Sequence, residues 1–455
     1  MAVWSESTLS EINKIKRNDA EYYQPYYRKL EKILNFSKTE QLSSLSFITD
    51  GIHGSPEIEE DGIRYISAKC VKDNYFITDN CIFISHKQNN SNPRTQLKDG
   101  DVIITTVGTI GNVAVVDEDV IPSNCDRHVG IIRIQNTDKL SPYYISTFLN
   151  SKYGRFQSMR ESAGNVQLNL YIKNIGNIYI PRFFNDEKKI APLTKKAYEQ
   201  RKLSQSLYTQ AQQLLEYELG LDKLEFKKPV GYEASFSEVV NNNRADADYY
   251  QTKFRFLKKH IRNINTKPLS QIANFTKGIE VGSSAYTDEG KLFLRVSNVK
   301  ETGIETGSSD KYINNNLFSS LQIFQPEINE LLLTKDGTPG ICYVVDEIID
   351  GIISGGIVKV KIINTSIPSE YLALVINSKI CRMQVERVCS GALIVHWKPG
   401  DISKLQIPIL SDGMMKKLSK LVAKSKQAKR ESQQLLNQAK TRVEQLIEEA
   451  PGKNE

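Results

Sequence analysis

Three short segments carry residue types and spacings that could do chemistry. Residues 186–188 (DEK) have the tail spacing of a nuclease metal site, yet no Pro-Asp pair precedes them and they open a helix-like stretch. An acidic helix N-terminus, which the helix dipole favours, is the better interpretation. Residues 108–111 (GTIG) lack the third glycine of a dinucleotide fingerprint, so a turn between strands is favoured. Residues 92–94 (NPR) lack the second proline and the aromatic residue of an adenine methyltransferase motif.

Other catalytic signatures are also missing from the sequence. No GxxxxGK[ST] phosphate loop occurs, the six cysteines form no CxxC pair, and the five histidines are isolated. We therefore expect a non-catalytic chain with no metal and no cofactor of its own. No apolar run approaches the ~20 residues that cross a bilayer, and the first residues do not resemble a signal peptide. These features predict a cytoplasmic protein without a membrane partner.

The length and the net charge limit the number of domains and the class of function only loosely. A chain of 455 residues holds two to four domains at ordinary domain sizes. The 60 basic residues exceed the 53 acidic ones, which gives a net charge of +7. A mild basic excess fits nucleic-acid binding but is also common in proteins that never bind it.

The chain contains an internal repeat. Residues 17–24 (RNDAEYYQ) return 227 positions later as residues 244–251 (RADADYYQ), and Ile180-Pro181 returns at the same offset as Ile407-Pro408. Each half reads as a short helix, then β-rich segments broken by Gly, Asn and Pro turns, then a helix and a closing strand. We expect a mixed α/β (α+β) protein with globular parts at 1–184 and 223–410.

A long helix is expected after each globular part, at 185–222 and at 411–450. Small or apolar residues recur at steps of three and four in both, which is a heptad seam. Because duplication sends the second helix back along the first, an antiparallel coiled coil joining two pseudo-twofold-related domains is predicted. The alternative is that each amphipathic helix packs on its own domain. The seam residues are Ile190, Leu193, Ala197, Gln200, Ser204, Leu207, Ala211 and Leu214, and then Met414, Leu418, Leu421, Ser425, Ala428, Ser432, Leu435, Ala439 and Leu446.

These segments resemble the specificity subunits of type I restriction–modification systems. The family-like segments are 100–111 (GDVIITTVGTIG), 162–169 (SAGNVQLN), 178–181 (IYIP) and 186–191 (DEKKIA). In the second copy, 335–340 (KDGTPG) keeps the glycines, whereas 390–393 (SGAL) lacks the Gln-x-Asn of the first. The resemblance spans the whole chain.

The resemblance implies a function. Such chains carry two target-recognition domains, here 1–184 and 223–410, joined by two conserved spacer helices. Each domain reads one half of a bipartite, asymmetric site on double-stranded DNA, and the chain itself catalyses nothing. Modification subunits, two of them, bind S-adenosylmethionine, dock on the helices and methylate adenine. Restriction subunits bring ATP and magnesium, and whether they join is left open.

Candidate DNA contacts are cationic or amide side chains in loops, because phosphates are bound by Lys and Arg and base edges by Arg, Lys, Asn and Gln. For any single one of them, a solvated loop with no contact to DNA is the favoured interpretation. Lys72 and Lys300 occupy matching places in the two copies, which suggests a shared phosphate contact, and we expect the loops to form one concave face. The candidates are Lys69, Lys72, Asn74, Lys87, Asn89, Asn90, Arg94, Arg127, Asn298, Lys300, Lys311, Tyr312, Asn314, Asn315, Lys335 and Lys398.

Candidate partner contacts lie on the two helices. They are Leu193, Leu207, Leu214, Lys420, Lys424 and Leu435. Residues 416–430 hold seven basic residues and no acidic one, which suits either the DNA backbone or an acidic partner surface. A different class of function also remains open: a duplicated, non-catalytic scaffold that binds proteins and has lost DNA reading. Salt-sensitive, sequence-dependent DNA binding distinguishes the two.

Overall fold

The computed structural model describes residues 4–78, 81–164, 167–222, 231–307, 309–389 and 395–450. The chain divides into two compact units. Unit 1 is Met1–Lys202 together with Lys429–Glu455, and unit 2 is Leu203–Ala428. The division falls within the two long helices, so each unit contains half of each helix.

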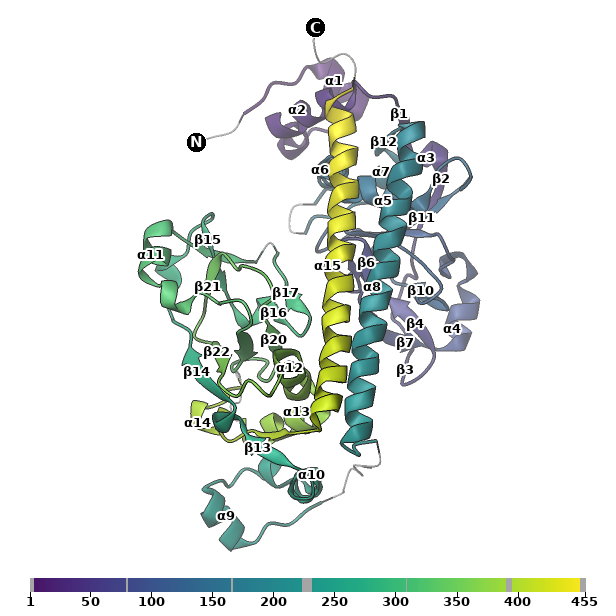
Figure 1. Ribbon diagram of the computed structural model, residues 1–455. Helices are drawn as coiled ribbons and strands as arrows, with labels where there is room; N and C mark the ends of the chain where they lie inside the picture. The colour runs from purple at the N-terminus through teal and green to yellow at the C-terminus, as the bar shows by residue number, and fades with distance from the viewer. Residues whose placement is uncertain are drawn as a thin grey trace. The chain divides into compact units, whose positions relative to one another are not determined.

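Unit 1 contains two four-stranded sheets (Figure 1). The first is antiparallel in the order β2-β11-β8-β9, and the second has the order β10-β4-β7-β3, with β10 parallel to β4. The sheet strands are β2 (Ser46–Asp50), β3 (Ile58–Glu59), β4 (Ile63–Ile66), β7 (Ile82–Ile84), β8 (Val102–Thr105), β9 (Val113–Val115), β10 (Ser123–Cys125) and β11 (Val129–Ile134).

Short elements complete unit 1. Two-stranded pairs join β1 (Thr39–Gln41) to β12 (Tyr179–Pro181) and β5 (Val71–Lys72) to β6 (Tyr75–Phe76). The helices are α1 (Leu9–Ile15), η1 (Ala20–Tyr23), α2 (Pro25–Leu34), α3 (Leu42–Leu45), α4 (His86–Ser91), η2 (Pro93–Thr95), α5 (Pro142–Asn150), α6 (Lys152–Glu161) and α7 (Ile172–Gly176).

Unit 2 repeats this order of elements. Its antiparallel sheet is β14-β22-β19-β20, and its second sheet is β18-β15-β21, with β21 parallel to β15. Its strands are β13 (Thr266–Pro268), β14 (Ala273–Lys277), β15 (Lys291–Leu294), β16 (Val299–Lys300), β17 (Gly303–Ile304), β18 (Lys311–Ile313), β19 (Leu331–Thr334), β20 (Cys342–Val344), β21 (Gly351–Ile353), β22 (Ile357–Ile362) and β23 (Gln406–Pro408). Its helices are α9 (Phe236–Asn242), η3 (Ala247–Tyr250), α10 (Thr252–Arg262), η4 (Leu269–Gln271), η5 (Ser283–Ala285), η6 (Val296–Asn298), α11 (Asn315–Ser320), η7 (Gln322–Phe324), α12 (Ser369–Asn377), α13 (Lys379–Val388) and α14 (Pro399–Ile402).

The repeat extends to buried hydrogen bonds. The Tyr144 hydroxyl donates to the carbonyl oxygen of Pro181 at 2.7 Å, and the Tyr371 hydroxyl donates to that of Pro408 at 2.9 Å. A buried hydroxyl needs a partner, since an unpaired one costs about 1–3 kcal/mol. The same hydrogen bond therefore joins the closing strand to a helix in each unit: β12 to α5 in unit 1, and β23 to α12 in unit 2.

One inner strand of each antiparallel sheet, β8 in unit 1 and β19 in unit 2, shows burial on both faces. In β8, Val102 and Ile104 join the core under α5, whereas Ile103 joins a second core on the other face. In β19, Leu331 and Leu333 face one core and Leu332 the other. Successive side chains of a strand point to opposite faces, so a strand between two layers reads as a continuous apolar run.

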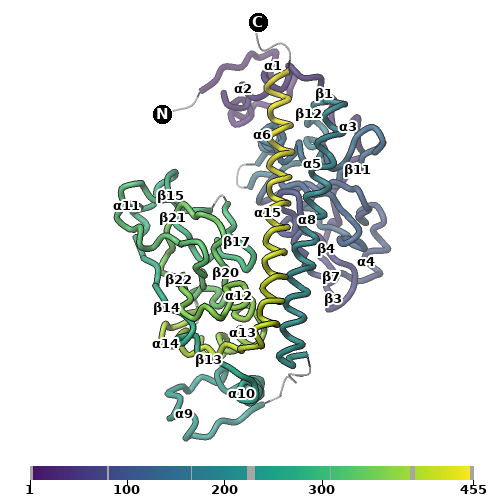
Figure 2. The backbone as a smooth tube through the Cα atoms, viewed as in Figure 1, coloured from purple at the N-terminus to yellow at the C-terminus, as the bar shows by residue number. Residues whose placement is uncertain are grey.

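The two long helices are α8 (Phe184–Glu218) and α15 (Asp412–Glu448), and they pack antiparallel (Figures 1 and 2). Within unit 1 the Ser432 hydroxyl donates to the carbonyl oxygen of Ala197 at 2.7 Å, and within unit 2 the Ser425 hydroxyl donates to that of Ser204 at 2.7 Å. Small seam residues let a side chain of one helix reach the backbone of the other. These contacts join the two helices along the seam and confirm the antiparallel pair. Every residue expected in the seam is buried or half-buried.

The ends of the long helices differ slightly from expectation. The first spans 184–218 rather than 185–222, and the second spans 412–448 rather than 411–450. Gly220 ends the first: it adopts a left-handed φ of 64°, and Leu221 N–H then bonds back to the carbonyl oxygen of Glu216 at 2.9 Å. Glycine adopts this conformation without a steric penalty, so the turn stops the helix.

Candidate nucleic-acid interface

A hollow of about 840 Å³ opens in unit 1 beside the parallel strand pair. Because β4 and β10 run parallel, the turns that follow them leave the sheet at the same edge, and the N–H of Asp126 bonds to the carbonyl oxygen of Ile66 at 3.0 Å. The turn after β4 brings Lys69 to the hollow and the turn after β10 brings Arg127. Two of the expected DNA-contacting cations therefore share one concavity.

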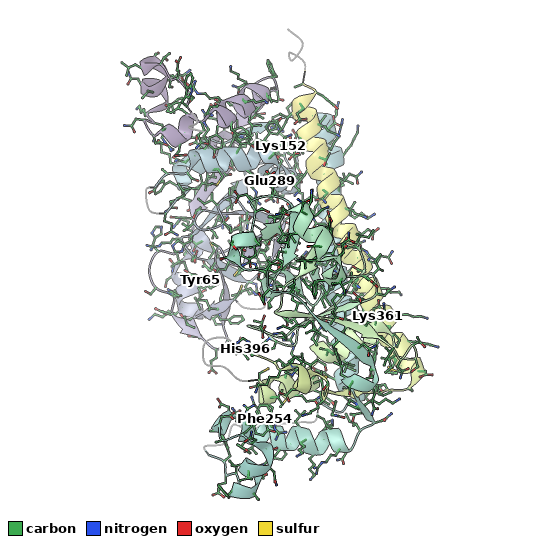
Figure 3. The ribbon with its side chains drawn as sticks, turned by 90° about the vertical axis from the view of Figure 1, so that its left-hand side faces the viewer. Tyr65, Lys152, Phe254, Glu289, Lys361 and His396 are labelled. Atoms are coloured by element: carbon green, nitrogen blue, oxygen red, sulfur yellow. The ribbon has the colours of Figure 1, made fainter. Side chains whose placement is uncertain are left out.

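The walls of this hollow combine apolar and polar groups. Tyr65, labelled in Figure 3, and Ile52 are buried wall residues, while Lys69 and Arg127 are exposed at it. Asp126 holds the second turn, because its carboxylate accepts the N–H of His128 at 2.8 Å. A concave site with exposed cations and an ordered turn can bind phosphate and present polar groups to a base edge.

A second group of exposed cations lies on α4 and η2. Lys87 and Asn90 are exposed, and the Arg94 guanidinium donates to the Asp50 carboxylate at 3.3 Å. Burial raises the pKa of Asp50, but hydrogen bonds from His53 and Arg94 outweigh it, so the pKa lies below the ordinary value. The carboxylate therefore stays ionised and holds Arg94 close to strand β2.

Four of the expected contact residues are instead buried at 9% exposure or less: Asn74, Asn89, Asn298 and Lys335. Asn74 accepts the Ser146 hydroxyl at 2.6 Å, and Asn89 accepts the amide of Asn124 at 3.0 Å. Asn298 donates to the Asp310 carboxylate at 2.8 Å, and Lys335 pairs with Asp336. The polar groups of these four side chains are therefore paired inside the units, and little of each side chain reaches the surface.

Lys72 and Lys300 do occupy matching places, each in a two-stranded hairpin and each half-buried. Lys72 does not line the hollow, and its hairpin meets the long helices: Lys440 Nζ lies 3.1 Å from the Asp73 carboxylate. In unit 2 the Tyr208 hydroxyl donates to Glu301, beside Lys300, at 2.9 Å. The two hairpins thus share a contact with a long helix.

Unit 2 presents different groups. Lys311, Asn314, Asn315 and Lys398 are exposed and Tyr312 is half-buried. Asn314 also caps α11 by accepting the N–H of Leu317 at 2.9 Å. These residues lie on β18, on α11 and ahead of α14, so the structure places most of the set in one β-strand and helix segment.

Asp336, which is not among the contact residues expected from the sequence, belongs to a charged cluster in unit 2. The Asp336 carboxylate lies between Lys335 and His396, whose Nδ1 is 2.7 Å away (Figure 3 labels His396). Burial raises the pKa of Asp336, yet hydrogen bonds from Lys335 and His396 outweigh it and the pKa falls below its ordinary value. The signal was present in the sequence, because charged Lys335-Asp336 stands where the first copy has Thr106-Val107.

The partner residues on the helices fall into two groups. Leu193, Leu207, Leu214 and Leu435 are half-buried in the seam, whereas Lys420 and Lys424 are exposed. One member of the basic run, Lys426, is buried and pairs with Asp346 at 3.0 Å. Four other lysines of this run, Lys416, Lys417, Lys420 and Lys424, have exposed side chains.

The described residues contain neither a cluster of metal-binding side chains nor a helix that could span a membrane. In that part of the chain no three or more His, Cys, Asp or Glu side chains are grouped to hold a metal ion. No helix within it is both long and apolar enough to cross a membrane. The family-like segment 390–393 and residues 165–166 of the first copy lie outside the described residues.

No family model and no curated protein matches the chain. The chain is similar to solved structures of type I restriction–modification S subunits over about nine-tenths of its length. The S subunit of the type I restriction–modification system from M. genitalium is 14% identical, with 90% of this chain and 95% of that chain covered and a TM-score of 0.42. The HsdS subunit from Thermoanaerobacter tengcongensis is 13% identical, with 91% and 97% covered and a TM-score of 0.30. The type IIG restriction endonuclease BpuSI is 11% identical, with 47% and 37% covered and a TM-score of 0.31.

Proposed function

We propose that this chain is the DNA sequence-specificity subunit of a type I restriction–modification complex. Each unit reads one half of a bipartite, asymmetric site on double-stranded DNA. The two helices set the gap between the halves and dock methyltransferase subunits. The chain itself is non-catalytic: S-adenosylmethionine belongs to the methyltransferase subunits, and ATP and magnesium to any restriction subunits.

The observation that carries this proposal is that the two units have the same order of elements but different side chains on their surfaces. The two units share their element order and their buried ties. After the parallel strand, unit 1 has Arg127 and His128 where unit 2 has Gly355 and Gly356. A duplicated fold with altered surface chemistry suits a target made of two different pieces.

The exposed side chains fit the chemistry of DNA recognition. Lys69 and Arg127 can neutralise phosphates or donate to guanine, and Asn90 or Asn315 can pair with adenine. Asp336 adds an acceptor, which suits the amino group of cytosine. The units therefore hold different donor and acceptor groups, as an asymmetric site requires.

The helix pair supports a spacing role. A helix of 35 residues spans about 50 Å at 1.5 Å per residue, which is about one and a half turns of B-DNA. Its seam contains small residues and buried hydroxyls, which let the two helices pack closely. Exposed Lys420 and Lys424 give it a cationic surface for DNA backbone or an acidic partner.

A protein-interaction scaffold is the second candidate, and one observation favours it. Leu9 on α1 is 72% exposed, and Phe236, at the matching place on α9, is 82% exposed. Exposed apolar side chains on both copies are typical of protein docking. This candidate predicts a complex with no sequence-dependent DNA binding.

Co-expression with a methyltransferase subunit tests the proposal. The purified complex is titrated with DNA fragments at several salt concentrations, and affinity is compared between fragments. The proposal expects affinity that falls steeply with salt and differs between sequences. A stable complex whose DNA affinity is the same for all fragments would support the scaffold instead.

A further inference from the structure

Two cysteines that are 11 residues apart in the sequence meet in the wall of the unit 1 hollow. The sulfur atoms of Cys70 and Cys81 lie 3.0 Å apart, and both residues line the hollow. Both side chains are largely buried, at 6% and 8% exposure. The pair therefore borders a space large enough to admit a small reagent without lying on the open surface.

The second copy shows what this pair replaces. Cys70 corresponds to Asn298 and Cys81 to Asp310, and in unit 2 those two side chains form a 2.8 Å hydrogen bond. Each pair closes the loop that carries a two-stranded hairpin, β5–β6 in unit 1 and β16–β17 in unit 2. Both units thus have a side-chain contact at this place in the loop, and in unit 1 the contact is between two thiols.

The surroundings favour the thiolate of Cys70. The pKa of Cys70 falls to about 6, because Cys81 donates a hydrogen bond to its sulfur and Ser67 adds another. Burial raises the pKa of Cys125, Cys342, Cys381 and Cys389 above the ordinary value. A thiolate is the nucleophile in thiol–disulfide exchange, so Cys70 is set apart from these four thiols.

We propose that Cys70 and Cys81 are an oxidation site that low-molecular-weight disulfides convert to an intrachain disulfide. This assignment is independent of the proposed DNA-reading function. The proposal rests on the short sulfur–sulfur distance and on the access that both residues have through the hollow. It rests also on the second copy, where the same two places in the loop are joined by a side-chain hydrogen bond.

The exchange balances with the added disulfide as the oxidant. The Cys70 thiolate attacks one sulfur of glutathione disulfide, so a Cys70–glutathione bond forms, the glutathione S–S bond breaks, and one glutathione thiolate leaves. Cys81 then loses its proton and attacks the Cys70 sulfur, which forms the Cys70–Cys81 bond and releases the second glutathione thiolate. Two protein thiols are oxidised, one disulfide is reduced, and the released thiolates take up the protons.

The test treats the reduced full-length chain with glutathione disulfide at neutral pH, alkylates the remaining thiols, and identifies the products by peptide mass spectrometry. We expect a Cys70–Cys81 cross-link that forms at least ten-fold faster than any modification of Cys125, Cys342 or Cys381. The double variant Cys70→Asn, Cys81→Asp, which copies the tie of unit 2, is the folded control and should take up no oxidant at this place.

The proposal is wrong if Cys70 and Cys81 are recovered alkylated, which means that they escaped oxidation, and if they react with glutathione disulfide no faster than the other thiols do. It is also wrong if glutathione stays on Cys70 and no cross-link follows. DNA affinity is measured on the same samples. A cross-link in a chain that binds no DNA would contradict the proposed function and leave the oxidation site standing.

Discussion

The Nζ of Lys426 lies 3.0 Å from the carboxylate of Asp346, so a cation in the middle of a basic helix is buried against unit 2. Unit 1 contains the same contact, because Lys202 of α8 lies 3.1 Å from Asp117. Both aspartates follow the edge strand of the antiparallel sheet by two residues, β9 in unit 1 and β20 in unit 2. In each unit a lysine of the long helix is therefore paired with the aspartate that follows the edge strand, and Lys202 also lies 2.9 Å from Asp119.

Removal of the Lys426 amine should destabilise unit 2. Lys426→Ala removes the ion pair with Asp346 and the hydrogen bond that Lys426 donates to the carbonyl oxygen of Val344 at 3.1 Å. We expect a loss of about 2 kcal/mol in the free energy of unfolding, below the range for a fully buried pair because Asp346 is partly exposed. Denaturant unfolding checks this. Lys424→Ala, which removes an exposed lysine from the same helix, should change stability by less than about 0.5 kcal/mol.

The two cations of the unit 1 hollow should contribute separately to DNA binding. Lys69→Ala and Arg127→Ala should each weaken binding roughly three- to ten-fold and lower the slope of log affinity against log salt by about one. Fluorescence titration at four salt concentrations measures both quantities. The control is Lys189→Ala, an exposed lysine on α8 outside the hollow. Equal effects from all three variants would remove the hollow from the interface.

Asp336 should affect the reading of one half-site only. Asp336→Asn exchanges an ionised acceptor for an amide, so the preference for one base should relax by about 1–3 kcal/mol in the half read by unit 2. Sequencing of methylated DNA from cells that express the variant complex displays both halves at once. Asp288→Asn, an exposed change in the same unit, is the control. A change in both halves, or in neither, would show that Asp336 does not read a base.

The reactivity of Cys70 should have an unusual pH dependence. Its pKa of about 6 means that the thiolate is already the main form at pH 7. The alkylation rate should therefore be nearly constant from pH 7 to pH 9 and fall about ten-fold per unit well below pH 6. Mass spectrometry of iodoacetamide adducts follows each cysteine. A rate for Cys70 that still climbs ten-fold between pH 7 and pH 8 would contradict the lowered pKa.

The helix seam should not tolerate a larger side chain. Ser432→Leu removes the hydrogen bond to Ala197 and adds volume where the helices are close, so we expect a loss of about 1–3 kcal/mol in the free energy of unfolding. Gln434→Leu is the control, since Gln434 is exposed two residues away. Thermal unfolding compares the two. Similar melting temperatures would mean that the helices separate to accept the leucine.

The features that repeat along the chain could be predicted from sequence. The 227-residue offset of the Tyr-Tyr block and the steps of three and four in the seam both report local spacing, and the structure confirms the antiparallel helix pair. Such patterns can be recognised in a sequence because each of the repeated residues lies in the same kind of environment.

The candidate site was harder to predict, because burial of a polar side chain depends on contacts that are distant in sequence. Asn74 is buried by Ser146, which lies 72 residues away, and Lys426 by Asp346, which lies 80 residues away. The sequence could not separate them from exposed neighbours such as Lys69 and Lys424. The pairing of Cys70 with Cys81 escaped notice for the same reason, since their spacing matches no motif.

The most direct test of the account is the methylation pattern of host DNA after co-expression of this chain with its methyltransferase subunit, read by single-molecule sequencing for methyladenine. The account predicts one motif of two unlike parts separated by a fixed gap, lost when the chain is omitted. A single continuous motif, or methylation that is random while the complex still forms, would contradict the claim that two units each read half of the site.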